Sequence, residues 1–285
     1  KKLILLSALF IFACSSDDDS TNESPIITVI GETIVTVNTF STYIDSGAIA
    51  SDNEDGDLTS SIVTTGLVNT SINGDYTITY TVSDSTGNTV TATRQVIVED
   101  DGNPVYLAEN GVTIKAKDWA LIGDSGVING IGYTIVNRET LFDMIQAGDD
   151  VTRVCTTRIL DIYGFIGNNT TFNQPIGNWD VSNVTQMRNL FKAAYSFNQN
   201  ISNWDVSNVT DMKSMFHAAT AFNQDISNWD VSNVTNMSLM FHQADFNLDL
   251  GNWNVDNVVE CTDFSHYGNP NWTLPQPNFT NCSPH

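Results

Sequence analysis

Basic residues are scarce in this chain. Its 285 residues include 11 Lys and Arg against 33 Asp and Glu, which gives a formal net charge of −22. A nucleic-acid-binding surface needs clustered Lys and Arg to neutralise phosphates, and a basic face that docks on anionic lipid needs the same residues. The composition therefore argues against both. A solvated acidic surface, a bound cation and a basic partner remain as reasons for the acidity.

Catalytic and metal-binding motifs are missing as well. The sequence has no G-x-S-x-G, no H-E-x-x-H and no phosphate-binding loop, and its four cysteines form no C-x-x-C or His/Cys cluster of the zinc-binding kind. His217 and His242 occupy equivalent repeat positions, and Lys192 stands there one repeat earlier. Such variation is typical of a tolerant exposed position and not of a metal pair. We therefore predict no enzymatic activity and no catalytic residue.

Apolar runs long enough to span a bilayer are also lacking. The run at residues 3–13 has 11 residues and follows Lys1 and Lys2, which is the pattern of an export signal. It ends in "IFAC", and a small residue followed by Cys14 resembles the lipobox of bacterial lipoproteins. That resemblance implies a signal peptide of residues 1–14 and acyl chains on Cys14. An ordinary secretory signal with an incidental cysteine is the alternative.

Residues 15–24 read "SSDDDSTNES" and contain no apolar side chain, so they predict a disordered acidic tether. Runs of Ser and Asp directly after a lipid-bearing cysteine resemble the surface-export signals of lipoproteins in the Bacteroidetes. The resemblance implies a protein anchored by lipid in the outer membrane and facing the cell exterior.

Residues 25–99 have the pattern of an all-β sandwich. In "GDYTITYTVSD", Tyr76, Ile78, Tyr80 and Val82 alternate with small polar residues, as they would on a half-buried strand. Other short strand-like runs in this segment are separated by turns rich in Gly, Asn and Asp. No cysteine lies in the segment, so a core pinned by an antibody-type disulfide is excluded.

Three stretches of this segment resemble the bacterial Ig-like repeats related to the HYR and cadherin-like modules of surface proteins. They are "SDNEDGDLTSSI" (51–62), "GDYTITYTVSDSTGN" (74–88) and "TATRQVIVED" (91–100). Such modules are usually spacers, so the resemblance implies a stalk that holds a second domain away from the membrane.

An acidic loop follows the first strands of this segment. Asp52, Asp55 and Asp57 lie around Gly56, together with an Asn and a Glu. Oxygen ligands on a flexible loop suit Ca²⁺, although the spacing is not that of an EF-hand. An acidic turn whose side chains cap local backbone groups explains the same residues, and both alternatives stay open. We predict no other cofactor.

Residues 100–110 form a predicted linker, and residues 111–171 a predicted N-terminal cap that ends in a half-repeat. Within the cap, residues 137–148 predict a helix that Asn137 caps and Gly148 ends, with Glu139 in its first turn. The predicted apolar face of this helix consists of Leu141, Phe142 and Ile145. In the half-repeat, Ile162, Phe165 and Ile166 fall where Met187, Leu190 and Phe191 fall one repeat later.

Residues 172–260 repeat one unit four times, and residues 261–285 form a predicted C-terminal cap. "NWDVSNVT" occurs at 178–185, 203–210 and 228–235, with a degenerate copy "NWNVDNVV" at 252–259. The period is 25, 25 and 24 residues when the copies are aligned on their phenylalanines, Phe172, Phe197, Phe222 and Phe246. A period of this length is typical of stacked repeats in which each unit buries a face against its neighbours.

Each unit predicts a short strand, a turn and a short helix. Trp204 and Val206 would point inward with Asp205 outward between them. The spacing of the following apolar residues suits a helix, at Val209, Met212, Met215, Phe216 and Ala219. The predicted fold is thus an Ig-like sandwich followed by an α/β leucine-rich-repeat-like solenoid. Its matched side chains would form columns, of Phe at the four positions above, of Trp at 179, 204, 229 and 253, and of Asn at 183, 208, 233 and 257.

The marks "FNQ(P/N/D)I", "NWDVSNVT" and "M-x-x-(L/M)F-x-x-A" resemble the BspA-like leucine-rich-repeat surface proteins of bacteria, over residues 110–282. The resemblance implies a surface adhesin. We therefore predict a surface-anchored, monomeric lipoprotein that binds an extracellular protein or glycan without catalysis. A glycan-binding lipoprotein of a nutrient-uptake system is the alternative, and exposed aromatics on the strand face would favour it.

Two further sets of residues are candidate sites. Asp180, Asp205 and Asp230 would align as an outward acidic ladder that holds cations or meets a basic partner, unless neighbouring Ser and Asn donors relieve their repulsion. Cys261 and Cys282 lie in one terminal segment of an exported chain, so they predict a disulfide. Cys155 is left over and is expected to be buried near the first repeat.

Overall fold

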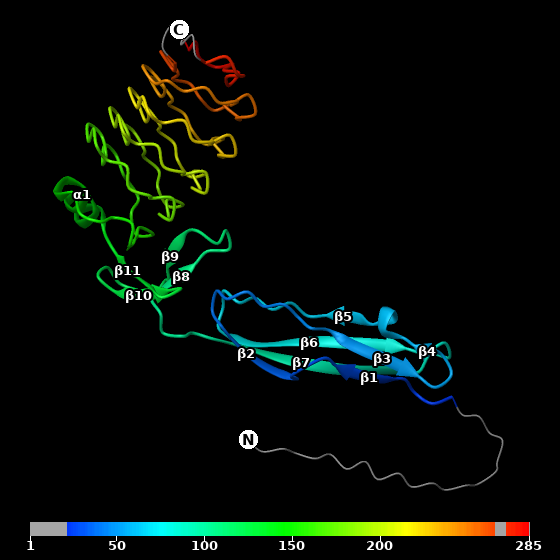
Figure 1. Ribbon diagram of the computed structural model, residues 1–285. Coiled ribbons are helices and arrows are strands. Elements are labelled where there is room, and N and C mark those ends of the chain that lie inside the picture. Colours follow the sequence, from blue (N-terminus) through cyan, green and yellow to red (C-terminus); the bar gives the residue numbers. More distant parts are fainter. Residues whose placement is uncertain (1–21, 266–271, 285) are drawn as a thin grey trace, which may run out of the picture. The chain divides into compact units, whose positions relative to one another are not determined.

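The computed structural model of the chain describes residues 22–265 and 272–284 and consists of two compact units, Lys1–Asp100 and Asp101–His285 (Figure 1). The whole predicted signal with Cys14, and residues 15–21 of the acidic tether, lie outside the described residues. None of the described helices combines the length and the apolarity needed to cross a membrane.

The first unit is built from two sheets. One contains β1 (Ile26–Val29), β3 (Ala48–Asp52) and β4 (Gly56–Asp57) in the order β1-β3-β4, and all of its pairs are antiparallel. The other has the order β2-β7-β6-β5, formed by β2 (Ile34–Asn38), β7 (Thr89–Glu99), β6 (Gly74–Ser83) and β5 (Val63–Thr65). Its β2–β7 pair is parallel and the others are antiparallel. A 3₁₀ turn, η1 (Thr59–Ser61), precedes β5.

Strand β6 carries the alternation that the sequence predicts. Ile78, Tyr80 and Val82 are buried, Tyr76 is half-buried, and the intervening threonines are more exposed. Ile78 and Tyr80 pack with Ala48 and Val96 into the core of this unit. The prediction of an Ig-like β-sandwich for this part of the chain fits the structure.

The second unit begins with short strands and one helix. Strands β8 (Val105–Leu107) and β9 (Ile114–Ala116) form an antiparallel pair. Strands β10 (Ser125–Ile128), β11 (Ile131–Ile135) and β12 (Val154–Cys155) form a second sheet, in which β11 and β12 are parallel.

Helix α1 (Arg138–Ala147) starts and ends where the sequence predicts. Asn137 accepts a hydrogen bond from the Thr140 backbone N–H at 2.8 Å, and Gly148 closes the helix in the left-handed region with φ of 78°. The predicted apolar face is partly wrong. Leu141 and Ile145 are buried, but Phe142 is 37% exposed and lies at the edge of the contact with the core.

Cys155 is a free, fully buried thiol on β12, and its Sγ lies 3.4 Å from the Ile114 carbonyl oxygen. Burial raises the pKa of this thiol, which disfavours the reactive thiolate. We expect Cys155 to resist a water-soluble maleimide in the native chain and to react fully in denaturant. Mass spectrometry of the labelled chain checks this, and rapid native labelling would contradict it.

The rest of the second unit is a stack of repeated coils that lie one beside the next (Figure 1). Residues one period apart are joined by isolated parallel bridges, in the series Asp161–Gln186, Gln186–Asp211, Asp211–Asn236 and Asn236–Glu260. The half-repeat is part of this stack, because Ile162, Phe165 and Ile166 are buried as predicted.

The predicted α/β leucine-rich-repeat-like solenoid is wrong. Among the described residues α1 is the only α-helix, and it precedes the repeats. The coils contain no α-helix, and no strand longer than a single bridge. The segment 201–209 does alternate between buried and exposed residues, but it consists of turns, such as the one closed by the Trp204 N–H and the Ile201 carbonyl oxygen at 3.1 Å.

The hydrogen bonds of residues 186–194 explain why no helix forms. The N–H groups of Met187, Asn189 and Phe191 donate to carbonyl groups of the next coil, at 2.9–3.0 Å. The N–H groups of Leu190 and Lys192 each donate to the carbonyl group three residues earlier and so close a turn. A helix would use all of these donors internally.

Backbone dihedrals give the second reason. Asn189 and Ala193 have φ of 57° and 54°, and the equivalent residues of later coils also have positive φ. A right-handed helix admits no such residue. The apolar side chains spaced three and four residues apart are therefore buried from successive turns and not from one face of a helix.

Side chains at matched positions of the coils do form columns. Ring centroids of Phe172, Phe197, Phe222 and Phe246 follow one another at 5.9–6.1 Å. Each repeat tryptophan donates its indole N–H to a carbonyl group of the preceding coil, as Trp204 does to Ile176 at 3.1 Å. The predicted asparagines donate likewise to backbone carbonyl oxygens one coil back, at 2.7–3.0 Å.

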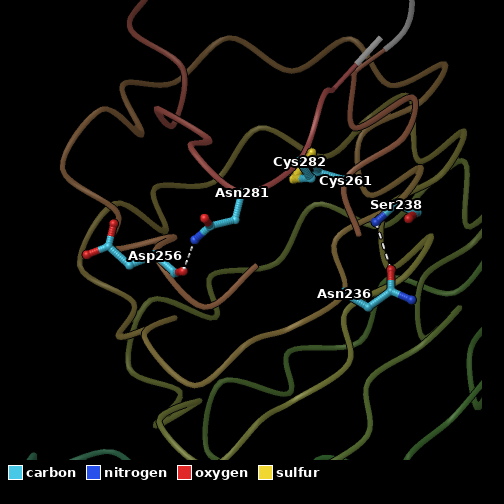
Figure 2. Close-up of a disulfide and its surroundings, with 6 residues drawn as sticks. All are labelled: Asn236, Ser238, Asp256, Cys261, Asn281 and Cys282. Atoms are coloured by element: carbon cyan, nitrogen blue, oxygen red, sulfur yellow. Dashed lines mark hydrogen bonds between the residues drawn. A yellow bond between two sulfur atoms is a disulfide. The ribbon is translucent and has the colours of Figure 1, made fainter. Parts of the chain in front are cut away.

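The C-terminal end of the stack is closed by a disulfide between Cys261 and Cys282, the pair that the sequence predicts (Figure 2). Their Cα atoms lie 5.9 Å apart across a sequence separation of 21 residues. Next to it, the Asn281 amide donates to the Asp256 carbonyl oxygen at 2.6 Å, which extends the asparagine column by one member (Figure 2).

Removing this disulfide is expected to destabilise the second unit by about 3 kcal/mol, because a closed loop of this length restricts the unfolded chain by that amount. We would replace both cysteines with serine and measure unfolding by calorimetry. The Cys155→Ser variant is the control for a thiol change that opens no loop. A double variant as stable as the parent chain would contradict the prediction.

Candidate binding surface

The acidic ladder of the repeats is only partly present. Asp205 and Asp230 are exposed as predicted. Each accepts a hydrogen bond from the backbone N–H two residues later, that of Ser207 at 3.1 Å and that of Ser232 at 3.0 Å. Hydrogen bonds from the Ser232 hydroxyl and then from its backbone N–H lower the pKa of Asp230. Local serine donors thus bind one oxygen of each of these carboxylates.

Asp180 departs from the prediction, because it is buried and not outward-facing. Strand β9 covers the first full coil, where the Ile114 N–H donates to the Asn178 carbonyl oxygen at 3.0 Å. The Lys115 ammonium of that strand lies 3.7 Å from an Asp180 carboxylate oxygen and 3.1 Å from the Ser182 hydroxyl. Asp180 therefore belongs to the contact between cap and coil. Of the three aspartates of the predicted ladder, only Asp205 and Asp230 are on the surface.

The acidic loop of the first unit forms local turns. Asp52 accepts hydrogen bonds from the N–H groups of Glu54 and Asp55, both at 2.9 Å, and Asp57 accepts one from Thr59 at 2.9 Å. No group of three His, Cys, Asp or Glu side chains arranged to hold a metal occurs among the residues that the structure describes.

Because its carboxylates already cap backbone donors, we expect the acidic loop to bind Ca²⁺ weakly or not at all. Calorimetric titration of the chain with CaCl₂, with Asp52→Asn as the control variant, measures this. Heat of binding that the Asp52→Asn variant loses would contradict the expectation and assign a calcium site to the loop.

Aromatic side chains are exposed in places that the repeat pattern does not predict. Tyr163 and Tyr195 of the stack are 45% and 49% exposed, and Trp119 of the cap is 51% exposed. None of them belongs to the segment on which the sequence predicted the strand face. Exposed aromatic rings provide the apolar contact that a ligand surface needs.

The described part of the second unit includes the following two concave sites. The larger, of about 570 Å³, is formed where β11 meets the first two coils, and Tyr133, Arg153 and Asn178 are among its lining residues. The smaller, of about 390 Å³, lies between α1 and the first coils. Both are within the range of about 300–1,000 Å³ found for small-molecule sites.

The tyrosine with the largest pKa shift belongs to the first unit. Burial and a hydrogen bond to Asp45 raise the pKa of Tyr80 to about 12. Arg94 forms an ion pair with Asp45, and its guanidinium also donates to the Glu32 carbonyl oxygen at 3.0 Å. This network joins strands of the first unit and has the character of a structural ion pair.

Two segments of the chain match described protein families. Residues 27–98 match the bacterial surface protein, Ig-like domain. Residues 160–271 match the family described as Mycoplasma protein of unknown function, DUF285. The chain thus contains a domain of a kind described for bacterial surface proteins. Its Ig-like domain corresponds to the sandwich of the first unit, and the second match covers the coils. The leucine-rich-repeat part of the resemblance finds no support in either match.

Solved structures with local likeness have low overall similarity. A lipoprotein from Bacteroides thetaiotaomicron is 23% identical with a TM-score of 0.26, over 29% of this chain and 43% of that one. The CBM51-2 and INT domains of ZmpB from Clostridium perfringens, solved in complex with GlcNAc, are 22% identical with a TM-score of 0.23, over 32% of this chain and 26% of that one. This chain thus spans less than half the length of each. None of the curated proteins matches it.

Proposed function

We propose that this surface protein binds an extracellular macromolecule through its stack of coils, without catalysis, and that the Ig-like domain serves as a spacer. The observation that carries the proposal is the coil-to-coil repetition. Equivalent indole, amide and backbone groups recur at every period and are bonded to the neighbouring coil. Catalysis requires unlike groups that converge on one point, whereas repetition provides an extended surface.

Attachment to the cell is part of this proposal. The lipobox-like sequence that ends at Cys14 supports a lipid anchor in the outer membrane, with the folded units outside the cell. A Cys14→Ala variant should leave the membrane fraction and lose the incorporation of labelled fatty acid. Protease digestion of intact cells should remove the wild-type protein if it faces outward. Persistent membrane attachment of the variant would refute lipidation at Cys14.

An array of glycans and extracellular matrix proteins, probed with the purified full chain, tests the binding function. We expect saturable binding to at least one class of ligand. A chain from which the coils 172–260 are deleted should lose that binding, and a chain that lacks the Ig-like domain should keep it. Binding that depends on the Ig-like domain alone, or no binding to any ligand, would refute the proposed role of the coils.

Glycan binding in nutrient uptake is the second candidate. The exposed rings of Tyr163 and Tyr195 favour it, because sugar rings stack on exposed aromatics. Under this alternative the array should show glycans only, and Tyr195→Ala should weaken binding. Binding to matrix proteins alone would exclude it.

A further inference from the structure

The smaller concave site has features that distinguish it from the rest of this acidic chain. It lies where α1 meets the half-repeat and the first full coil, and has a volume of about 390 Å³. Its walls are formed by Arg138 and Phe142 of the helix, and by Tyr163, Asn168, Asn189 and Lys192 of the coils. We call it the α1 pocket.

The half-repeat has two glycines at this pocket, and a Cβ atom added to Gly167 would lie 2.9 Å from the Asn189 carbonyl oxygen. Gly164 and Gly167 line the pocket, and they stand one period before Asn189 and Lys192. Gly164 has φ of 67°, and a Cβ atom added to it would meet nothing within 4 Å. Later in the stack the column of Lys192 is filled, since His217 and His242 lie there with ring centroids 5.0 Å apart. The half-repeat thus presents no side chain at two positions where the next coil has Asn189 and Lys192, and open space lies next to Gly164.

Positive charge gathers at this pocket in a chain of net charge −22. Arg138 and Lys192 line it, and the Arg188 guanidinium lies 6.0 Å from the centre of the Tyr163 ring at its rim. No Asp or Glu is among its lining residues. None of the ion pairs among the described residues involves Lys192.

A carboxylate lies beside one cation of the pocket. Asp161 is 3.8 Å from the Arg138 guanidinium, and both side chains are more than 40% exposed. An exposed pair at this distance is weak, so a ligand anion can compete for the guanidinium. The face of Phe165, whose centre is 5.0 Å from Arg138 Cζ, holds the guanidinium in place.

The other walls suit a sugar ring. Phe142 and Tyr163 are 37% and 45% exposed, and they offer apolar faces to a pyranose. The amides of Asn168 and Asn189 provide donors and acceptors for hydroxyl groups. The Asn189 amide lies 3.5 Å from the Tyr163 hydroxyl, which orients both groups.

We propose that the α1 pocket binds an anionic sugar residue, a pyranose that carries a carboxylate or a sulfate, at the end or within the chain of an acidic glycan. Arg138 and Lys192 bind the anionic substituent, and Phe142 and Tyr163 contact the ring. The inference rests on the proposed binding function and names its ligand class. The chain's negative charge repels polyanions elsewhere on its surface, so such a ligand is directed to this pocket.

Titration calorimetry with the purified full chain tests the inference. The probes are an oligogalacturonate, a sulfated galactan oligosaccharide and a neutral galactan oligosaccharide of equal length. They show whether binding depends on a carboxylate, on a sulfate or on the uncharged sugar ring alone. We expect at least one anionic probe to bind about tenfold or more tightly than the neutral one, the ratio expected for one charge-assisted contact. The affinity should fall between 20 and 200 mM salt, because the contacts are half-exposed and salt screens them over about 10 Å at 0.1 M.

Two variants locate the site. Lys192→Ala removes a cation, and Gly164→Asn places in the pocket the residue that the next coil uses at the same position with positive φ. Each variant should weaken the affinity for the anionic probe about tenfold and leave the melting temperature unchanged. Lys213→Ala, a lysine of the next coil outside the pocket lining, is the matched control and should bind as the parent chain does.

The inference is overturned if the neutral probe binds as tightly as the anionic ones, if no anionic probe binds, or if both variants bind as the parent chain does. In each of these cases the glycan and protein array still decides the broader proposal. If the array identifies a ligand, the proposed binding function stands but uses another site. If no ligand binds to the array, both proposals are refuted.

Discussion

Trp204→Ala is expected to lower the free energy of unfolding of the second unit by about 3–5 kcal/mol, the cost of removing a large buried aromatic side chain. Trp204 is 3% exposed and packs against Trp179, whose ring centroid is 6.4 Å away, and Phe191, at 6.0 Å. Its loss also leaves the Ile176 carbonyl oxygen without the indole N–H that now binds it at 3.1 Å. Scanning calorimetry of the full chain measures the effect.

Two further variants separate the causes. Trp204→Phe retains a ring but removes the N–H donor, so it should cost about 1–3 kcal/mol, from the loss of one buried hydrogen bond and a smaller volume. The Ile176 carbonyl oxygen keeps the Trp179 backbone N–H at 3.1 Å. Tyr195→Ala removes an exposed aromatic of the same stack and should change stability by less than about 0.5 kcal/mol. If Trp204→Ala were as mild as Tyr195→Ala, the coils would not depend on the tryptophan column for stability.

Arg94→Met is expected to destabilise the Ig-like domain by about 3–5 kcal/mol, because it leaves the Asp45 carboxylate partly buried without its cation. Asp45 also accepts hydrogen bonds from the hydroxyl groups of Tyr80, at 2.7 Å, and Tyr43, at 3.1 Å. These bonds suit a charged carboxylate, so the aspartate cannot simply be neutralised without loss. The double variant Arg94→Met/Asp45→Asn should recover part of the stability, because no uncompensated charge remains.

The same network predicts the acid sensitivity of the Ig-like domain. Burial acts to raise the pKa of Asp45, but hydrogen bonds from Tyr80 and Tyr43 and the Arg94 charge hold it below the ordinary value of 3.8. The native state thus favours the ionised form more than the unfolded chain does. This contribution to stability is complete above the ordinary pKa and is lost as the pH falls below it. We expect the melting temperature of the domain to drop below about pH 4, and Asp45→Asn to flatten that drop.

Gln95→Ala is the matched control for these variants. Gln95 follows Arg94 on β7, and its amide accepts an exposed hydrogen bond from Thr77 at 3.1 Å. Its removal should shift stability by less than about 0.5 kcal/mol. The Arg94→Met domain could prove as stable as the Gln95→Ala domain, or Asp45→Asn could leave the dependence of stability on pH unchanged. Either result would show that the ion pair makes no net contribution to the stability of the domain.

Local signals in the sequence located several elements correctly. The alternation around Tyr80 predicted which face of β6 is buried, since period 2 has one structural meaning in a half-buried strand. Asn137 and Gly148 predicted the ends of α1, because capping depends on adjacent residues only. The shared terminal segment of Cys261 and Cys282 was sufficient to predict their disulfide.

The secondary structure inside the coils could not be predicted in this way. Apolar residues at the spacing of Met212, Met215 and Phe216 suit a helix equally well, and the positive φ of Ser214 and Ala218 is one of the two features that rule it out. Ser and Ala give no hint of that conformation. It is imposed by the neighbouring coil, whose carbonyl groups bind the Ser214 and Ala218 N–H groups at 2.9 and 2.8 Å.

The predictions about candidate sites failed where a side chain is placed by residues distant in the sequence. The sequence pointed to Asp180 as an outward acid, but Lys115, which lies 65 positions earlier, approaches it in the folded chain. It also assigned Phe142 to the core, whereas the helix is placed so that this ring borders the α1 pocket. Gly164 and Gly167 carried the one available signal, as repeat positions that lack a side chain.

The sequence by itself determined the Ig-like sandwich, the period of the coils and the residues that fill their interior, because each depends on neighbours in the chain or on exact repetition. Only the tertiary structure decided that the coils are turns without helices, that Asp180 is covered, and that a cationic pocket opens beside α1. These features depend on backbone groups and side chains brought together from separate coils, which no local pattern specifies.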